Sequence, residues 1–214
     1  MNIVIVDDHP VVRKGLRTIL EENGYTVCGE AEDGNQAVKI ISGCEPDLAI
    51  VDIELKGNVN GIELISAIRS RFSSVSILVM SMDDGTLYAE RSIQAGAKGY
   101  VTKAEASDNI INAIEAVMAG KLFLSRAISE KIAGKHILGS VDENEVNVSL
   151  LSPREFEIFR LLGMGYKRNE ISKQLNMNIN TIESHRRNIR DKFNLKDSSE
   201  ITKAAVAWFI KEKR

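Results

Sequence analysis

Short apolar runs alternate with helical patterns over the first 120 residues of the chain. Runs bounded by polar or turn residues, typical of buried parallel strands, occur at 2–7, 26–30, 47–52, 75–81 and 98–102. Stretches typical of helices lie between them near 10–22, 34–43, 61–72 and 85–95, and a fifth runs from about 106 to 119. These units predict an α/β fold: a doubly wound, five-stranded parallel sheet in the flavodoxin-like strand order 2-1-3-4-5.

The segment after residue 120 is less regular. Residues 120–133 keep a helical pattern that could extend the last helix or form another. From about 135 to 149 the apolar period is lost and acidic residues gather, which is typical of a linker. We therefore expect one domain over 1–120, a helical extension and linker over 121–148, and a second domain over 149–214.

The pattern from Ser152 onward is purely helical. Ser152, Pro153 and Glu155 have the spacing of a capping box with proline at the first helical position. Gly163 and Gly165 end that helix, and further helices are predicted near 168–175, 179–193 and 198–211. The middle two predict a helix-turn-helix within a small all-α domain.

The overall formal charge of −2 hides an asymmetry along the chain. Residues 1–149 carry 14 lysines and arginines against 22 aspartates and glutamates, whereas residues 150–214 carry 14 against 8. A basic segment attached to an acidic body is typical of a nucleic-acid binder, although many basic faces are only solvated surface.

Hydropathy and cysteine usage restrict the class of protein further. No apolar stretch approaches the ~20 residues that span a bilayer, and the start lacks a charged segment with a cleavage site. We therefore expect a soluble, cytoplasmic protein with no membrane partner. Cys28 and Cys44 fall in or near predicted core elements, which favours small buried apolar residues over metal ligands.

Chemically active side chains stand at the ends of four predicted strands. Asp7 and Asp8 end the first, Asp52 the third, Ser81 the fourth and Lys103 the fifth. Open parallel sheets bind ligands beyond the carboxyl ends of their strands, so these side chains should converge on one crevice. Carboxylates suit Mg²⁺, an aspartate can be a nucleophile towards phosphorus, and a lysine and a hydroxyl can hold phosphoryl oxygens. The sequence therefore predicts a site for a divalent cation and a phosphoryl group.

Each of these residues also has a simpler interpretation. Asp8 and Ser81 could cap the helices that follow them, and Lys103 could be solvated. Such roles explain the residues one at a time, but they do not explain why all five stand at strand ends.

Residues 1–120 resemble the receiver domain of bacterial two-component response regulators. The resemblance is carried by Ile5-Val-Asp-Asp-His-Pro10, Asp52, Ser81 and Gly96-Ala-Lys-Gly-Tyr-Val-Thr-Lys103. It implies that Asp52 accepts a phosphoryl group from a sensor histidine kinase while Asp7 and Asp8 hold Mg²⁺. It also implies that Ser81 and Lys103 are the switch hydroxyl and lysine. Tyr100 matches the family's switch aromatic, with a half-buried strand aromatic as the alternative.

The segment after Asp52 departs from the family pattern. The family has a Met-Pro pair there and a glycine eight residues beyond the aspartate, whereas this chain has no proline and places Gly61 nine residues on. We expect a longer, less rigid loop. The resemblance makes the backbone carbonyl of Glu54 a metal ligand. The Glu54 side chain lies where it could orient or exclude the attacking water, so it affects the lifetime of the phosphoryl group.

The longer helix of the predicted helix-turn-helix has two chemically different faces. Ile179, Ile182, Ile189 and Phe193 recur at helical spacing and should face the core, which leaves Glu183, Ser184, Arg187 and Asn188 on the opposite arc. Arg187 could read guanine, and Glu183 could accept from cytosine or merely repel phosphate. The flanking cations, which would hold phosphates, are Arg186, Arg190 and Lys192. A solvated helix of mixed charge is the alternative.

Residues 149–211 resemble the LuxR-type DNA-binding domain. The motifs are Leu151-Ser-Pro-Arg-Glu155, Glu170-Ile171 and Thr181-Ile-Glu-Ser-His185. The match implies that the region from Thr181 binds DNA, with Glu183, Ser184 and Arg187 facing base edges, and that the last helix pairs two chains. Together the two halves are similar to NarL/FixJ-type response regulators.

This resemblance implies a transcription regulator rather than an enzyme, although it would slowly hydrolyse its own aspartyl phosphate. The expected partners are a sensor histidine kinase, double-stranded promoter DNA, a second copy of the chain when phosphorylated, and RNA polymerase. Two alternatives stay open. One is a phosphatase or phosphotransferase, which would need a substrate-binding cap and a general acid. The other is a DNA-binding protein whose first domain dimerises without phosphorylation.

Overall fold

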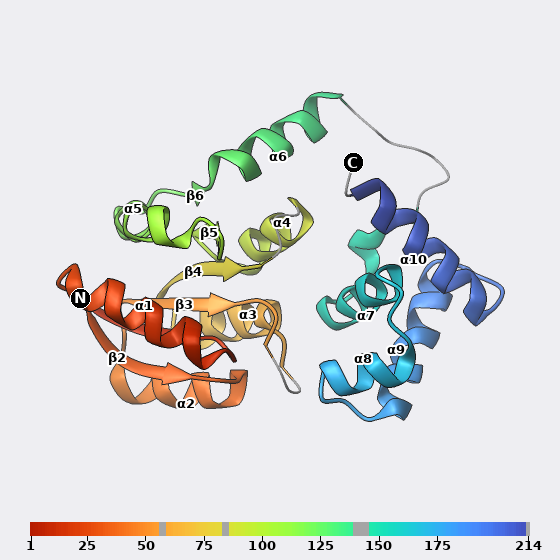
Figure 1. Ribbon diagram of the computed structural model, residues 1–214, viewed down its shortest axis with the longest axis horizontal. Coiled ribbons are helices and arrows are strands. Elements are labelled where there is room, and N and C mark those ends of the chain that lie inside the picture. Colours follow the sequence, from red (N-terminus) through yellow and green to blue (C-terminus); the bar gives the residue numbers. More distant parts are fainter. Residues whose placement is uncertain (56–58, 83–85, 139–145, 213–214) are drawn as a thin grey trace. The chain divides into compact units, whose positions relative to one another are not determined.

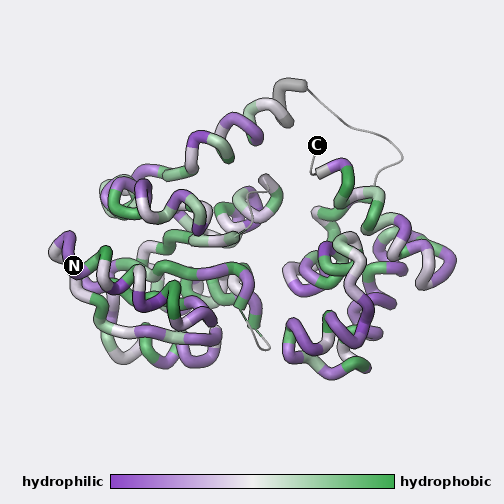
Figure 2. Tube along the Cα trace, in the orientation of Figure 1, coloured by the Kyte–Doolittle hydropathy of each residue, from purple (hydrophilic) through white to green (hydrophobic). Residues whose placement is uncertain are grey.

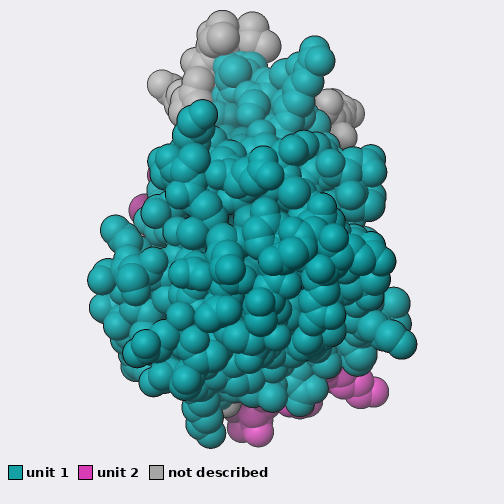
Figure 3. All heavy atoms as spheres, turned by 90° about the vertical axis from the view of Figure 1, so that its left-hand side faces the viewer, with its two compact units in different colours: residues 1–138 teal, residues 139–214 magenta. Residues whose placement is uncertain are grey.

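The computed structural model describes residues 1–55, 59–82, 86–138 and 146–212. The chain divides into two compact units, residues 1–138 and 139–214, which Figure 3 colours separately. No helix among the described residues is long and apolar enough to cross a membrane.

The first unit is built on a parallel sheet (Figure 1). Its strands are β1 (Asn2–Val6), β2 (Thr26–Ala31), β3 (Leu48–Asp52), β4 (Ser76–Ser81), β5 (Gly99–Thr102) and β6 (Phe123–Leu124). They lie in the order β2-β1-β3-β4-β5-β6, and every neighbouring pair is parallel. The predicted order of the first five strands is confirmed.

Five helices alternate with the first five strands. They are α1 (Pro10–Glu22), α2 (Gly34–Cys44), α3 (Gly61–Arg71), α4 (Thr86–Ala95) and α5 (Ala106–Met118). One buried cluster joins α1 and α5 to alternate strand residues, among them Ile5, Ile50 and Met80. The intervening strand residues are buried as well, and α2, α3 and α4 contact the sheet. Burial on both faces explains why these strands have continuous apolar sequences. Figure 2 shows the resulting hydrophobic colouring along the central strands.

The sixth strand was not predicted. Phe123 and Leu124 pair with Gly99 and Tyr100 of β5, and the helix α6 (Arg126–Leu138) then packs on α4. A two-residue strand is too short to show an alternating pattern, so only the unpaired edge of β5 decides it. Gly99 permits the approach, because a Cβ there would lie 2.7 Å from Leu78 Cδ1 and 3.3 Å from the Phe123 oxygen.

The predicted linker overlaps regular structure at both ends. The helix α6 extends to Leu138, and the 3₁₀ helix η1 covers Val148–Leu150. Most of the acidic part of the predicted linker, residues 139–145, lies outside the described residues.

The second unit contains four α-helices after η1: α7 (Pro153–Gly163), α8 (Arg168–Gln174), α9 (Ile179–Lys192) and α10 (Ser198–Glu212). The capping box is present as predicted. Ser152 Oγ accepts from the Glu155 nitrogen at 3.3 Å, and Glu155 Oε2 accepts from the Ser152 nitrogen at 2.8 Å. The helix α7 ends at Gly163, where a Cβ would lie 2.6 Å from the Ala205 oxygen, so this glycine lets α7 and α10 pack closely.

Aromatic rings from α7, from α10 and from Phe193, the residue that follows α9, form the centre of this unit. Phe156 and Phe159 of α7 pack on Trp208 of α10, with ring centroids 5.4 and 5.9 Å apart, and Phe159 also meets Phe193 at 5.3 Å. Ile182 and Ile189 of α9 are fully buried, as predicted. Ile179 was wrongly placed in the core: it is the first residue of α9 and is 40% exposed.

Candidate functional sites

The carboxyl edge of the sheet gathers the side chains that the strand ends predict. Val6 is the last residue of β1, so Asp7 and Asp8 follow directly, while Asp52 ends β3. Ser81 ends β4, and Lys103 follows the end of β5. Since β1, β3, β4 and β5 are neighbours in the sheet, these residues share one edge.

Lys103 joins two strands through their buried carboxylates. Its Nζ lies 2.7 Å from Asp7 Oδ2 and 2.7 Å from Asp52 Oδ2. Asp7 is 0% and Asp52 1% exposed, so both charges are removed from water. Asp52 Oδ1 also accepts from the Glu54 nitrogen at 3.2 Å, which orients the carboxylate. The Lys103 nitrogen donates to the Ser81 oxygen at 2.7 Å and ties β4 to the lysine.

Burial and charge act in opposite directions on this pair. Burial raises the pKa of Asp52 to about 6, although Lys103 lowers it; Asp7 raises it again. Burial lowers the pKa of Lys103, but the attraction of Asp52 and Asp7 outweighs it and the pKa is raised overall. Lys103 therefore stays charged at neutral pH, while Asp52 holds its proton more tightly than an ordinary aspartate does.

A pH dependence of stability follows from the raised pKa of Asp52. Because the folded chain binds the Asp52 proton more tightly than the unfolded chain does, protonation of Asp52 stabilises the fold at low pH. This stabilisation is lost as the pH rises from 3.8, the ordinary pKa of an aspartate, through about 6, the pKa of Asp52 in the folded chain. Asp52→Asn removes the cost of the buried charge and leaves Lys103 paired with Asp7. In metal-free buffer we expect its stability relative to wild type to rise between pH 4 and pH 7, by at most about 3 kcal/mol. Urea unfolding of both proteins across this range tests it, and a difference that does not vary with pH contradicts it.

The acidic residues fit a divalent cation. Ligand atoms of Asp7, Asp8, His9 and Asp52 all lie within 4.8 Å of one another. Three carboxylates stand against the charge of Lys103, so a divalent ion would offset the remaining negative charge, and hard oxygen donors suit Mg²⁺. His9 is the member that the strand-end pattern did not single out. Its Nδ1 lies 2.7 Å from Asp8 Oδ1 and 3.2 Å from Asp7 Oδ1, and its side chain is 56% exposed.

The other residues expected near this edge differ in burial. Ser81 is fully buried at the end of β4. Tyr100 is fully buried in β5, deeper than the half-buried aromatic that was the alternative, and it lies opposite Val79 in the strand register. Glu54 is partly exposed, and its backbone nitrogen is the group that meets Asp52.

The structure explains the glycine after the unusual loop. A Cβ on Gly61 would lie 2.3 Å from the Asp52 oxygen and 2.4 Å from Ile53 Cα. Only glycine allows α3 to begin this close to the end of β3. Asn60 caps the helix in a capping box with Glu63, so the additional residue lies before this point. Residues 56–58 lie outside the described residues, and the expected lower rigidity of the loop is untested.

The helix-turn-helix of the second unit is formed by α8 and α9. Asn178 caps α9 by accepting from the Asn180 nitrogen at 2.9 Å, which sets where the helix begins. Along α9, four of the residues that the sequence assigned to the DNA-facing arc or motif are exposed: Thr181, Ser184, Arg187 and Asn188. Glu183 is partly buried.

Two of the cations expected to hold phosphate are engaged within the protein. Arg186 is only 15% exposed; its Nη1 lies 3.0 Å from Glu183 Oε1, and its Nη2 lies 3.4 Å from the Ser198 oxygen. Lys192 Nζ contacts Glu155 Oε2 at 2.6 Å and the Leu150 oxygen at 3.0 Å. These contacts fit structural roles better than phosphate binding.

The third flanking cation, Arg190, remains partly exposed. It contacts the adjacent Asp191 at 2.9 Å and keeps 34% of its side chain exposed.

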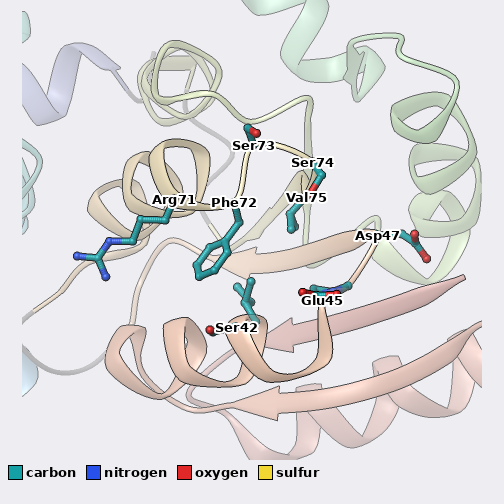
Figure 4. A pocket seen from close by; sticks show the side chains of 10 residues that line it. Ser42, Glu45, Asp47, Arg71, Phe72, Ser73, Ser74 and Val75 are labelled. Carbon is teal, nitrogen blue, oxygen red and sulfur yellow. The ribbon is translucent and has the colours of Figure 1, made fainter.

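The first unit also has a hollow of about 510 Å³. It lies near the ends of α2 and α3 that precede β3 and β4, away from Asp52. In Figure 4 the Phe72 ring points toward α2. The residues lining it are Ile41, Ser42, Glu45, Pro46, Asp47, Arg71, Phe72, Ser73, Ser74 and Val75.

Each of the two units of the chain matches a known protein family. Residues 3–115 match the response regulator receiver domain, and residues 149–205 match the bacterial regulatory proteins of the luxR family. These matches and the fold define a two-component response regulator with a LuxR-type DNA-binding domain. The chain belongs to the NarL/FixJ-type response regulators.

Relatives match along nearly the whole chain. Response regulator UvrY of Escherichia coli K12 is 32% identical over 207 residues, covering 96% of this chain and 94% of UvrY. RcsB of Salmonella enterica serovar Typhimurium, solved bound to promoter P1flhDC with the phosphomimetic BeF₃⁻, is 28% identical with a TM-score of 0.65, covering 97% of this chain and 98% of RcsB. Another structure, of two RcsB dimers bound to two parallel DNAs, is 29% identical with a TM-score of 0.59. The match covers 95% of this chain and 96% of the RcsB chain.

Proposed function

We propose that phosphorylation of Asp52 by a sensor histidine kinase controls the binding of this regulator to promoter DNA. The observation that carries the proposal is Lys103 held 2.7 Å from both Asp7 and Asp52, at the sheet edge that also presents Asp8 and Ser81. A buried nucleophilic carboxylate beside a fixed cation and a metal-binding acid pair is suited to accepting a phosphoryl group.

The residues divide the chemistry of phosphoryl transfer between them. Asp7, Asp8, Asp52 and the Glu54 carbonyl would hold Mg²⁺, which offsets charge on the incoming phosphoryl group. A carboxylate oxygen of Asp52 attacks phosphorus, and the bond from phosphorus to the donor breaks. Lys103 then exchanges its contact with Asp52 for a phosphoryl oxygen, and the Ser81 hydroxyl donates to another. Tyr100 would follow the movement of Ser81.

Phosphorylation and DNA binding are assigned to separate domains, with the boundaries proposed from the sequence. The receiver covers 1–120, an extension and linker cover 121–148, and the DNA-binding domain covers 149–214. The pairing of β6 with β5 ties the start of the extension to the receiver sheet. The receiver would hydrolyse its own aspartyl phosphate slowly. The proposed role of the protein is nevertheless that of a regulator in the cytoplasm rather than that of an enzyme.

DNA recognition is assigned to the exposed arc of α9. Thr181, Ser184 and Arg187 are exposed there, and Arg187 would read guanine. Two copies joined after phosphorylation would place two α9 helices about one helical turn apart on promoter DNA, where RNA polymerase is a further partner. The dimers of RcsB on DNA support this arrangement.

The coupled effect of phosphorylation tests the proposal. The full chain is incubated with a small phosphodonor, with Mg²⁺ or with excess chelator, and intact mass and oligomeric state are read together. We expect a phosphoryl-sized mass gain and dimer formation only with Mg²⁺. A gain without dimers would replace pairing by release of the DNA-binding domain. No gain, with DNA binding intact, would favour dimerisation without phosphorylation.

The contacts of Arg186 predict a different role from that of Arg190. Each phosphate contact contributes about −0.9 to the slope of log affinity against log salt on duplex DNA. We expect Arg190→Ala to reduce the steepness of this slope by about 1. Arg186→Ala should leave the slope unchanged. It should weaken DNA binding indirectly, because the Arg186 side chain holds Glu183 and the start of α10 in place. Titrations of both variants with random-sequence duplex at several salt concentrations measure this, and equal slope changes would return Arg186 to the phosphate contacts.

A further inference from the structure

The two cysteines of the chain lie against each other. Cys28 is in β2 and Cys44 is the last residue of α2, 16 positions apart in sequence. Their sulfur atoms are 3.0 Å apart. Cys28 Sγ also lies 3.5 Å from the Ile3 oxygen of β1. The sequence indicated two isolated core residues, whereas the packing of α2 on β2 makes them a dithiol.

The surroundings of the dithiol favour a covalent bond over a metal site. Among the described residues, the acid and histidine group at Asp7 is the cluster able to hold a metal ion, and neither cysteine belongs to it. A disulfide needs a sulfur separation of about 2.05 Å, so the two atoms would have to approach by about 1 Å. Both side chains are only partly buried, which leaves a path for a small reagent.

We propose that Cys28 and Cys44 form a reversible intramolecular disulfide by exchange with a low-molecular-weight disulfide. The thiolate of one cysteine attacks a sulfur of the small disulfide, forming a mixed disulfide and releasing one small thiolate. The second cysteine gives its proton to water and attacks the bound protein sulfur, and the second small thiolate leaves. The protein is oxidised by loss of two hydrogens, and the small disulfide is reduced to two thiols.

The bond would tie the end of α2 to the edge strand of the sheet. Burial raises the pKa of the Cys44 thiol to about 12, so this thiol stays protonated at neutral pH and exchange should accelerate in alkaline buffer. Cys44 is followed by Glu45 in the left-handed region (φ 43°), and then by Pro46, which lines the hollow between the ends of α2 and α3. Cys28 and Cys44 are both free thiols in this structure. Disulfides of cytosolic proteins are commonly transient and redox-sensing, and a bond between these two would be of that kind.

Glutathione buffers of defined thiol-to-disulfide ratio test the proposal on the full chain. After an acid quench and alkylation, intact mass distinguishes an internal disulfide from free thiols and from glutathione adducts. We expect oxidised wild type to lose two hydrogens, to resist alkylation and to remain a single chain. Its thermal midpoint should exceed that of the reduced protein by several degrees. Cys28→Ser and Cys44→Ser are the matched controls and should each accept at most one glutathione.

Any of four results would overturn the proposal. Wild type could stay fully alkylatable in excess glutathione disulfide, carry a glutathione on each cysteine, or cross-link two chains. Recovery of two alkylatable thiols on return to reducing buffer is required as well, because a bond that does not reopen is not a switch. Wild type alone decides these outcomes, so they hold even if a serine variant folds poorly.

Discussion

Asp52→Asn is expected to abolish phosphoryl uptake from a small phosphodonor, whereas wild type gains one phosphoryl mass. The amide has no anionic oxygen to attack phosphorus, and it removes one of three carboxylates from the metal-binding group. The variant should still fold, because Lys103 keeps Asp7 as a partner at 2.7 Å. Intact mass after incubation with Mg²⁺ measures the result.

An exposed aspartate serves as the matched control for this substitution. Asp108 lies in the first turn of α5 and is exposed. Asp108→Asn should therefore accept a phosphoryl group as wild type does. A mass gain in Asp52→Asn would assign the acceptor to another residue, and peptide mapping of the modified chain would then locate it.

Lys103→Met is expected to destabilise the chain by about 3–5 kcal/mol at pH 8 in metal-free buffer. The substitution leaves Asp7 and Asp52 buried without the cation that lies 2.7 Å from each. The loss should shrink near pH 5, because the pKa of Asp52, already about 6, rises further without Lys103 and the carboxyl takes up a proton. Saturating Mg²⁺ should restore part of the stability by replacing the missing positive charge.

Lys98→Met is the matched control for this second prediction. Lys98 precedes β5 and is exposed, and its Nζ lies 3.4 Å from Ser76 Oγ. Within the described part of the chain, no carboxylate forms an ion pair with it. Its loss should change the free energy of unfolding by less than about 0.5 kcal/mol. Urea unfolding of the two variants at both pH values measures the effect. Equal losses in the two variants, or a loss in Lys103→Met that ignores pH, would show that the ion pair contributes little.

The sequence by itself determined the first five strands, the helices between and after them, and the edge of the sheet at which the reactive residues meet. Continuous apolar runs specify strands buried on both faces, and parallel strands place their carboxyl ends together, so Asp7, Asp52 and Lys103 could be grouped without coordinates. The capping box at Ser152 was likewise readable, because it depends on residues three positions apart.

Only the tertiary structure decided which long side chains are already engaged and which distant atoms touch. In the sequence of α9, Arg186 and Lys192 have the pattern of exposed cations. In the fold, Arg186 contacts the Ser198 oxygen and Lys192 contacts the Leu150 oxygen, and both oxygens come from other elements. The short strand β6 exists because the edge of β5 accepts it. The dithiol of Cys28 and Cys44 exists because α2 packs on β2. The local pattern of apolar and polar residues predicts whether a side chain is buried. It does not predict which residue distant in sequence the side chain contacts, because that depends on how all the helices and strands pack together.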